Sequence, residues 1–206
     1  MTNDIGKGIL LASVLAGLSL AGLALGASMM PLDRVLAALW GQGSRPDTII
    51  LWNLRMPRVA LAVLAGAALG IAGVLLQRAT RNPLAAPSVL GIVDGAALGV
   101  LLFLLVFSNE ANALTVSIYW QPVAAATGAC VFAALVALLW RREVHKPMRL
   151  ILYGVALAAL ANALVVLLII KGPVYRASQA LIWLAGSVHE AERRDVTTLA
   201  IALACL

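Results

Sequence analysis

Long apolar runs separated by short polar segments dominate the chain and set its predicted elements. The runs are rich in Leu, Ala, Val and Gly and do not alternate with polar residues, which indicates helices rather than the strands of a barrel. Each of the first five is close to the ~20 residues that a helix needs to cross the hydrocarbon core. We predict membrane spans at residues 8–30, 59–76, 88–107, 123–140 and 150–170, with an incomplete sixth at 196–206.

These spans predict an all-α, polytopic integral membrane protein, with one helical bundle forming a single transmembrane domain over residues 1–206. A signal peptide is the alternative for the first run, because Lys7 precedes it and small residues end it. That run is longer than the apolar region of a signal peptide, so we interpret it as a retained helix. The sixth run stops before it could cross, and we therefore expect the N-terminal portion of a longer protein.

Composition agrees with a membrane protein. The chain is 63% hydrophobic and 12% charged, with a mean hydropathy of +0.99, and a soluble domain could not cover that much apolar surface. The net charge of +6 comes from basic residues that lie between the apolar runs. Membrane topology explains that placement, so we expect lipid and no nucleic acid as a partner.

The charges of the connecting segments predict an orientation. The connector "RREVHKPMR" carries four basic residues, whereas "SNEANALTVSIYWQ" carries none. The positive-inside rule places the first connector and the N-terminus in the cytoplasm. The segment 31–58 then lies outside, although it holds cations that the rule disfavours there. These cations are Arg34, Arg45, Arg55 and Arg58. Three explanations are open: they contact lipid headgroups, the topology is inverted, or they face a negatively charged partner.

Glycines spaced four apart indicate close packing between helices, since residues at this spacing share one helix face. The two sets are Gly66 with Gly70, and Gly91 with Gly95 and Gly99. Pro83 and Pro87 interrupt the connection between these spans. Irregular backbone at membrane depth needs protein or a water-filled path around it, so this connection is a candidate conformational element.

Asp94 is the one acidic residue well inside a predicted span. Such a carboxylate suggests a proton or cation site, although pairing with a nearby arginine or with polar groups at the span ends is the alternative. His145 and His189 have no partner at metal-binding spacing. The sequence also lacks a P-loop and the common hydrolase motifs. We therefore predict no catalytic residues, no metal site and no enzyme.

Six motifs lie between residues 54 and 187: "LRMPR", "GAALGIAGVLLQ", "RNPLAAPSVLGI", "GAALG", "LYGVALAAL" and "WLAGS". Among them, "RNPLAAPSVLGI" is specific. These motifs resemble those of the permeases of bacterial importers for iron-siderophore complexes, haem and cobalamin, the type II ABC importers of the FecCD family.

The resemblance implies a ten-span permease of the inner membrane, of which about six spans are present, in a homodimer or heterodimer around a translocation path. Two cytoplasmic subunits would bind ATP-Mg, with no cofactor on this chain, and a periplasmic binding protein would deliver the substrate. It also implies that Arg55 and Arg58 meet glutamates of the binding protein. The cytoplasmic gate would use Asn82 and Leu84, with Pro147 and Met148 at a second gate position.

Our first hypothesis is therefore a permease for ferric siderophores that works by alternating access. Cobalamin or haem are alternative substrates. A proton-coupled secondary transporter using Asp94 is an alternative from another class, and a non-transporting scaffold of glycine-packed helices is a third.

Overall fold

The computed structural model describes residues 2–26, 28–83, 85–109, 113–143, 145–171, 182, 184–189 and 191–205, with the backbone alone for residues 2–4 and 147. Within these ranges the regular elements are helices, and the only strand-like pairing is an isolated bridge between Ser108 and Leu114. Four described helices are long and apolar enough to cross a membrane: Ile5–Ala24, Arg45–Thr80, Ile118–Trp140 and Met148–Lys171. The predicted all-α membrane fold is confirmed.

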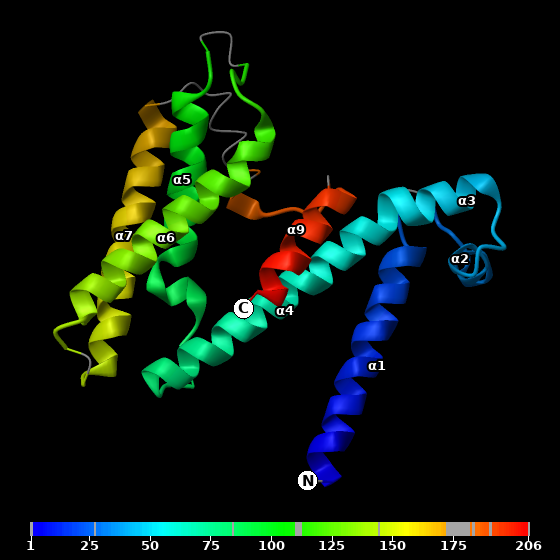
Figure 1. Cartoon of the computed structure of the whole chain (residues 1–206), viewed down its shortest axis with the longest axis horizontal. Coiled ribbons are helices and arrows are strands. Elements are labelled where there is room, and N and C mark those ends of the chain that lie inside the picture. The colour runs from blue at the N-terminus through cyan, green and yellow to red at the C-terminus, as the bar shows by residue number, and fades with distance from the viewer. Residues whose placement is uncertain are drawn as a thin grey trace. The chain divides into compact units, whose positions relative to one another are not determined.

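The chain divides into two compact units, Met1–Ala68 with Val188–Leu206, and Leu69–Ser187. The sequence predicted one transmembrane domain over the whole chain. The long helix α4 (Met56–Thr80) contributes to both. Figure 1 labels the helices of each unit.

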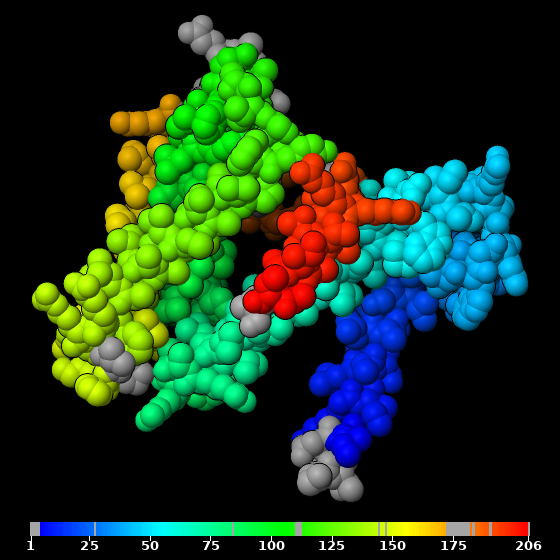
Figure 2. Space-filling model, viewed as in Figure 1, coloured from blue at the N-terminus to red at the C-terminus, as the bar shows by residue number. Residues whose placement is uncertain are grey.

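The first unit begins with α1 (Thr2–Ala24), whose apolar side chains lie on the surface along most of the helix (Figure 2). Three short helical segments follow: α2 (Leu32–Leu39), α3 (Arg45–Ile49) and the π-helical η1 (Ile50–Arg55), which continues into α4. The helix α9 (Arg193–Ala204) completes the unit. Its core joins the last turn of α1 to α2 and η1 through Leu23, Met30, Val35, Ala38 and Leu51.

The second unit is built on three helices that pack against one another, α5 (Ile92–Val106), α6 (Gln121–Trp140) and α7 (Pro147–Lys171) (Figure 1). Two 3₁₀ turns lead into them, η2 (Pro87–Leu90) before α5 and η3 (Ile118–Trp120) before α6. Apolar clusters fill the contacts between these helices, with Phe103 and Leu104 on α5 and Val136 on α6 among their buried members.

The helix ends differ from the predicted span ends where the backbone has a local reason to turn. The first helix ends at Ala24 rather than at Met30. The third begins at Ile92 rather than at Ser88, because Pro87 opens a 3₁₀ turn and Gly91 adopts a left-handed φ of 68°. Apolar composition extends through such turns, so it could not predict these boundaries.

Candidate functional site: the arginine segment, the turn and the packed glycines

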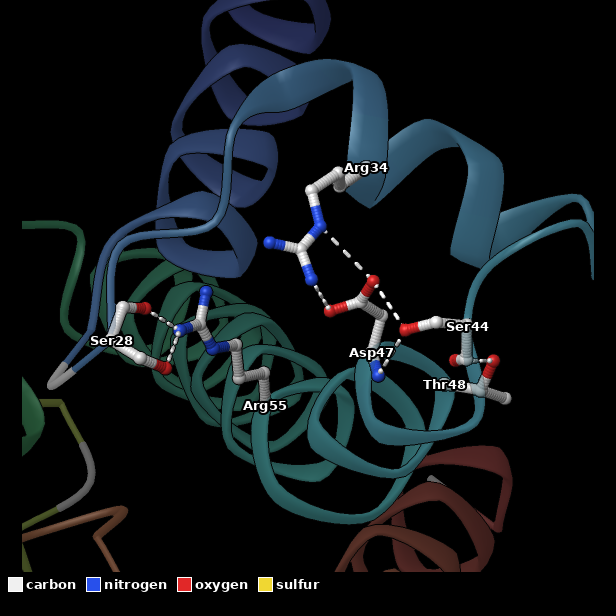
Figure 3. Close-up of polar contacts among 6 residues, drawn as sticks. All are labelled: Ser28, Arg34, Ser44, Asp47, Thr48 and Arg55. Carbon is white, nitrogen blue, oxygen red and sulfur yellow. Dashed lines mark hydrogen bonds and ion pairs between the residues drawn. The ribbon is translucent and has the colours of Figure 1, made fainter.

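Arg55 lies inside the first unit and bonds to the end of α1, and Figure 3 shows its contacts with Ser28 just beyond that helix. Its Nη1 donates to the carbonyl oxygens of Leu23 at 2.5 Å and Ala24 at 2.9 Å. Its Nη2 donates to the carbonyl oxygen of Ser28, and at 3.3 Å to the Ser28 hydroxyl. The residue is only 7% exposed. Arg55 therefore fixes the chain that leaves α1 against the start of α4.

This contact has a direct electrostatic reason. The last carbonyl groups of a helix have no partner within the helix and carry the negative end of its dipole. A guanidinium presents several donors in one plane, so one side chain can serve several of them. Gly26 stands beside it, and a Cβ there would lie 3.0 Å from Nη2 of Arg55. The glycine at position 26, which has no Cβ, thus leaves room for the guanidinium of Arg55.

Arg58 differs from Arg55, although both were predicted to dock a partner. Arg58 is half-buried in the first turn of α4, and the structure shows no hydrogen bond from its guanidinium to the described residues. Arg45 is exposed at the start of α3. The side chain of Arg45 is exposed and that of Arg58 half-buried, with no hydrogen bond to the described residues, whereas both Nη atoms of Arg55 already donate to backbone carbonyls.

Arg34 is committed to an ion pair. Its Nε and Nη2 donate to the two carboxylate oxygens of Asp47 at 3.1 and 2.5 Å, and the Ser44 hydroxyl donates to the same carboxylate at 2.7 Å (Figure 3). Asp47 is 5% exposed. The hydrogen bond to Asp47 is the largest reason why the pKa of Arg34 is raised. This pair ties α2 to α3, and the sequence analysis did not predict it.

Arg193 makes a second contact that the sequence did not predict. Its Nη2 donates to the carbonyl oxygen of Trp52 at 3.2 Å and to Oδ1 of Asn53 at 2.8 Å. The contact holds the start of α9 to η1, although 140 positions separate Arg193 from Asn53. The only signal in the sequence was the basic pair at positions 193 and 194, and it does not indicate which residues Arg193 contacts.

The predicted gate residues fall in two segments of the second unit. Asn82 lies in the turn that follows α4, where its N–H bonds to the carbonyl of Gln77 at 3.2 Å. Leu84 lies outside the described residues. Pro147 opens α7, and the Met148 side chain beside it is 63% exposed.

A shared apolar cluster brings these two segments to one end of the unit. Leu76 of α4, Leu90 of η2 and Leu150 of α7 belong to it. The turn and the start of α7 are thus neighbours, as a gate formed by both segments would require.

The two sets of glycines have different surroundings. A Cβ at Gly99 would lie 2.3 Å from the carbonyl oxygen of Ala124, and one at Gly95 would lie 2.5 Å from the Phe132 ring. Gly91 packs its left-handed backbone against Ala158 of α7, where a Cβ would lie 2.8 Å from the backbone nitrogen. Gly66 and Gly70 have nothing within 4 Å of an added Cβ. Of the two sets, only the second is closely packed against other described residues.

Among the described residues, Asp94 pairs with an amide and not with a cation. Nδ2 of Asn162, on α7, donates to Oδ1 of Asp94 at 2.8 Å and also to the carbonyl oxygen of Ala158 at 3.1 Å. Asp94 lies in the first turn of α5, where the positive end of the helix dipole favours a carboxylate. Among the described residues, no group of three His, Cys, Asp or Glu side chains is placed to hold a metal ion.

Comparison with known proteins identifies the family. The model of the FecCD transport family matches residues 11–206. The chain belongs to the FecCD transport family. This family consists of transporter permeases and not of enzymes.

Relatives of known name agree with the FecCD assignment. The chain is 41% identical over 180 residues to the "Probable siderophore transport system permease protein YfhA" of Bacillus subtilis. These residues cover 85% of this chain and 52% of YfhA. It is 35% identical to the achromobactin transport system permease protein CbrC of Dickeya dadantii, over 96% of this chain and 55% of CbrC. It is 37% identical to the ferric enterobactin transport system permease protein FepG of Escherichia coli, over 86% of this chain and 51% of FepG. The chain thus spans about half the length of these FecCD relatives.

A solved structure shows the same fold. It is described as an inward-facing conformation of a metal-chelate type ABC transporter, and it matches with a TM-score of 0.77 at 23% identity. The match covers 99% of this chain and 61% of that chain. The FecCD chain described here therefore has the fold of an ABC transporter permease over nearly its whole length.

Proposed function

We propose that this chain is the N-terminal part of the permease subunit of an ATP-driven importer, which carries ferric siderophores across the bacterial inner membrane by alternating access. The observation that carries the proposal is the family match over residues 11–206, together with relatives named for siderophore, achromobactin and ferric enterobactin transport. Cobalamin and haem are the alternative cargoes, and competition between unlabelled cargoes for uptake would separate them.

The proposed assembly contains a second permease subunit, two ATP-binding subunits in the cytoplasm and a periplasmic binding protein. ATP-Mg belongs to the ATP-binding subunits, and this chain holds no cofactor. The N-terminus lies in the cytoplasm, as the basic connector 141–149 supports. Labelling of single cysteines from outside the cell tests this orientation, because it must reach the segment 31–58 and not that connector.

Within this assembly, Arg58 is the docking cation and Arg55 positions the segment that presents it. Arg58 is half-buried and has no hydrogen bond to the described residues, whereas Arg55 is 7% exposed and bonds to α1. A guanidinium grips a carboxylate with two parallel hydrogen bonds, so a glutamate on the binding protein suits Arg58. Charge complementarity of this kind fixes orientation and speeds association.

The docking experiment uses the complete gene product in nanodiscs, together with its purified binding protein. Arg58→Glu should weaken docking by about tenfold or more, which corresponds to about 1.4 kcal/mol, and should lower siderophore uptake in step. Arg141→Glu, an exposed arginine of the other connector, is the matched control and should leave docking unchanged. A compensating Glu→Arg change on the binding protein should restore docking to Arg58→Glu. Equal docking by wild type and Arg58→Glu would refute this role.

The gate proposal assigns closure to Asn82, in the turn that follows α4, and to Leu84, with Pro147 and Met148 at the start of α7 as the second gate position. The shared cluster of Leu76, Leu90 and Leu150 supports it, because it holds both segments at one end of the second unit. Cysteines at positions 82 and 148 should crosslink in one nucleotide state of the assembled importer and not in the other. Crosslinking at the same rate in both states would contradict the gate.

A further inference from the structure

The exposed side of α2 carries apolar side chains that the core of the first unit leaves uncovered. Leu32, Leu36 and Trp40 follow one another at intervals of four residues and are 53%, 36% and 72% exposed. We call these three residues the α2 stripe. Val35 and Ala38, on the neighbouring face of the helix, are fully buried. At 100° per residue the apolar arc of α2 spans about 200°, so the core covers only one part of it.

We propose that the α2 stripe inserts into the bilayer surface, and that α2 is an interfacial helix bound to lipid. The position of α2 in the fold is the first reason. Its buried residues Val35 and Ala38 pack in one cluster with Leu23, which lies in the last turn of the candidate span Ile5–Ala24. A helix held at the end of a span lies at the level where hydrocarbon gives way to headgroups.

The second reason is that the stripe continues the apolar surface of α1. Leu18 and Leu25 are 68% and 62% exposed, and Met29, just before α2, is 82% exposed. A membrane-spanning helix presents exposed apolar side chains such as these to the lipid. Exposed apolar side chains thus occur on α1, in the chain that leaves it and on α2, and one apolar solvent can cover all three.

Trp40 provides the third reason. Its indole N–H has no acceptor among the described residues, and its ring is largely exposed. Tryptophan gathers at membrane interfaces because an apolar ring and a polar N–H suit a layer that is apolar on one side and wet on the other. Trp40 stands at the end of the stripe, directly before the polar residues Gln42 and Ser44.

The charges of this segment favour lipid over an acidic protein partner. Between Pro31 and Asp47 there are two arginines and two aspartates, so the net charge is zero. One of these arginines, Arg34, is already paired with Asp47. Attachment must therefore come from the apolar side chains, and it should be insensitive to the charge of the lipid and to salt.

The first experiment measures the depth of Trp40 in the complete gene product in nanodiscs, with every other tryptophan, including the four others of this chain, changed to phenylalanine. Lipids brominated at a shallow chain position should quench Trp40 by about twofold or more, and lipids brominated near the bilayer centre should quench it less. The result should be the same in neutral and in anionic lipid. Quenching by aqueous acrylamide with none by bromolipid would overturn the proposal, and so would quenching that needs anionic lipid.

A second measurement keeps every tryptophan in place. A spin label at Leu36→Cys, in a background where the exposed Cys130 and Cys205 are alanine, should be reached by oxygen from the bilayer and shielded from an aqueous nickel chelate. Gln42→Cys, at an exposed polar position, is the matched control and should show the reverse preference. Shielding of position 36 from both reagents would indicate a protein occupant and overturn the proposal. Adding the binding protein or diluting the permease would then show whether that occupant is the binding protein or a second copy.

Discussion

The contact between Arg55 and the end of α1 gives the sharpest prediction. Replacing Arg55 by methionine keeps a long side chain and removes the donors that reach the carbonyls of Leu23, Ala24 and Ser28. A hydrogen bond from a charged group contributes about 1.5–3 kcal/mol. Three such bonds would give an upper limit of about 4.5–9 kcal/mol, before two opposing effects are counted.

The first opposing effect is that only the bond to Leu23 is fully buried, so water can reach the other carbonyls once the arginine is gone. The second is that removing a buried cation recovers its desolvation cost. We therefore expect Arg55→Met to lower the free energy of unfolding by about 2–4 kcal/mol, or ~30- to ~1,000-fold in the equilibrium constant. Arg55→Lys should fall between this variant and the wild type, because an ammonium cannot reach all three carbonyls at once.

Equilibrium unfolding of the purified protein in mixed micelles, titrated with dodecyl sulfate and followed by circular dichroism, measures the effect. Arg58→Met is the matched control, since Arg58 has no hydrogen bond to the described residues and should change stability by less than about 0.5 kcal/mol. Equal loss of stability in Arg55→Met and Arg58→Met would refute the reasoning. It would mean that Arg55 is not what holds α1 to the start of α4.

Three further predictions concern the second unit. Gly99→Ala should destabilise the protein by about 2 kcal/mol or more, because its Cβ would meet a backbone oxygen at 2.3 Å. Gly70→Ala should be neutral or stabilising by up to about 1 kcal/mol. The same micelle titration compares the two variants. Asp94→Asn should retain uptake driven by ATP, since an amide can still bond to its neighbour on α7. If this variant failed to take up substrate, and wild-type uptake collapsed with the proton gradient, the proton-coupled alternative would be favoured. The hydrogen bond from Arg149 lowers the pKa of Glu143 below its ordinary 4.5. That contact should therefore persist as the pH falls through 4.5 and be lost only below it, as the NMR shift of the Glu143 carboxyl carbon would show; titration at 4.5 or above would contradict it.

The sequence predicted the helical membrane fold because apolar run length and composition are properties that lipid selects directly. It could not predict which of two arginines turns inward. Arg55 and Arg58 are three positions apart in one motif, and the partners of Arg55 lie about 30 positions earlier in the chain. A backbone carbonyl leaves no signature in the residue type that carries it, so Leu23 and Ala24 gave no sign of a bound cation.

The candidate pairs of the second unit show the same limit. Asp94 stood out as an acid in an apolar run, and polar pairing was the expected alternative to an ion site. Its partner Asn162 is 68 positions away on α7, and a single amide in a mostly apolar run does not indicate which residue it contacts. Glycine spacing likewise predicted two sets for packing. Of these two sets, only Gly91, Gly95 and Gly99 have a close neighbour among the described residues, because spacing shows a shared face but not what lies opposite it.

The π-helical turn at Ile50–Arg55 has a consequence for how this segment tolerates insertions and deletions. Leu51 and Arg55 are its two buried residues, and Arg58 follows in the first turn of the α-helix beyond it. A π turn holds one residue more than an α turn. Losing that residue would rotate the downstream helix by about 100° relative to Leu51. The number of residues between Leu51 and Arg58 therefore decides which cation faces inward, so a one-codon deletion here should be harder to tolerate than most single replacements.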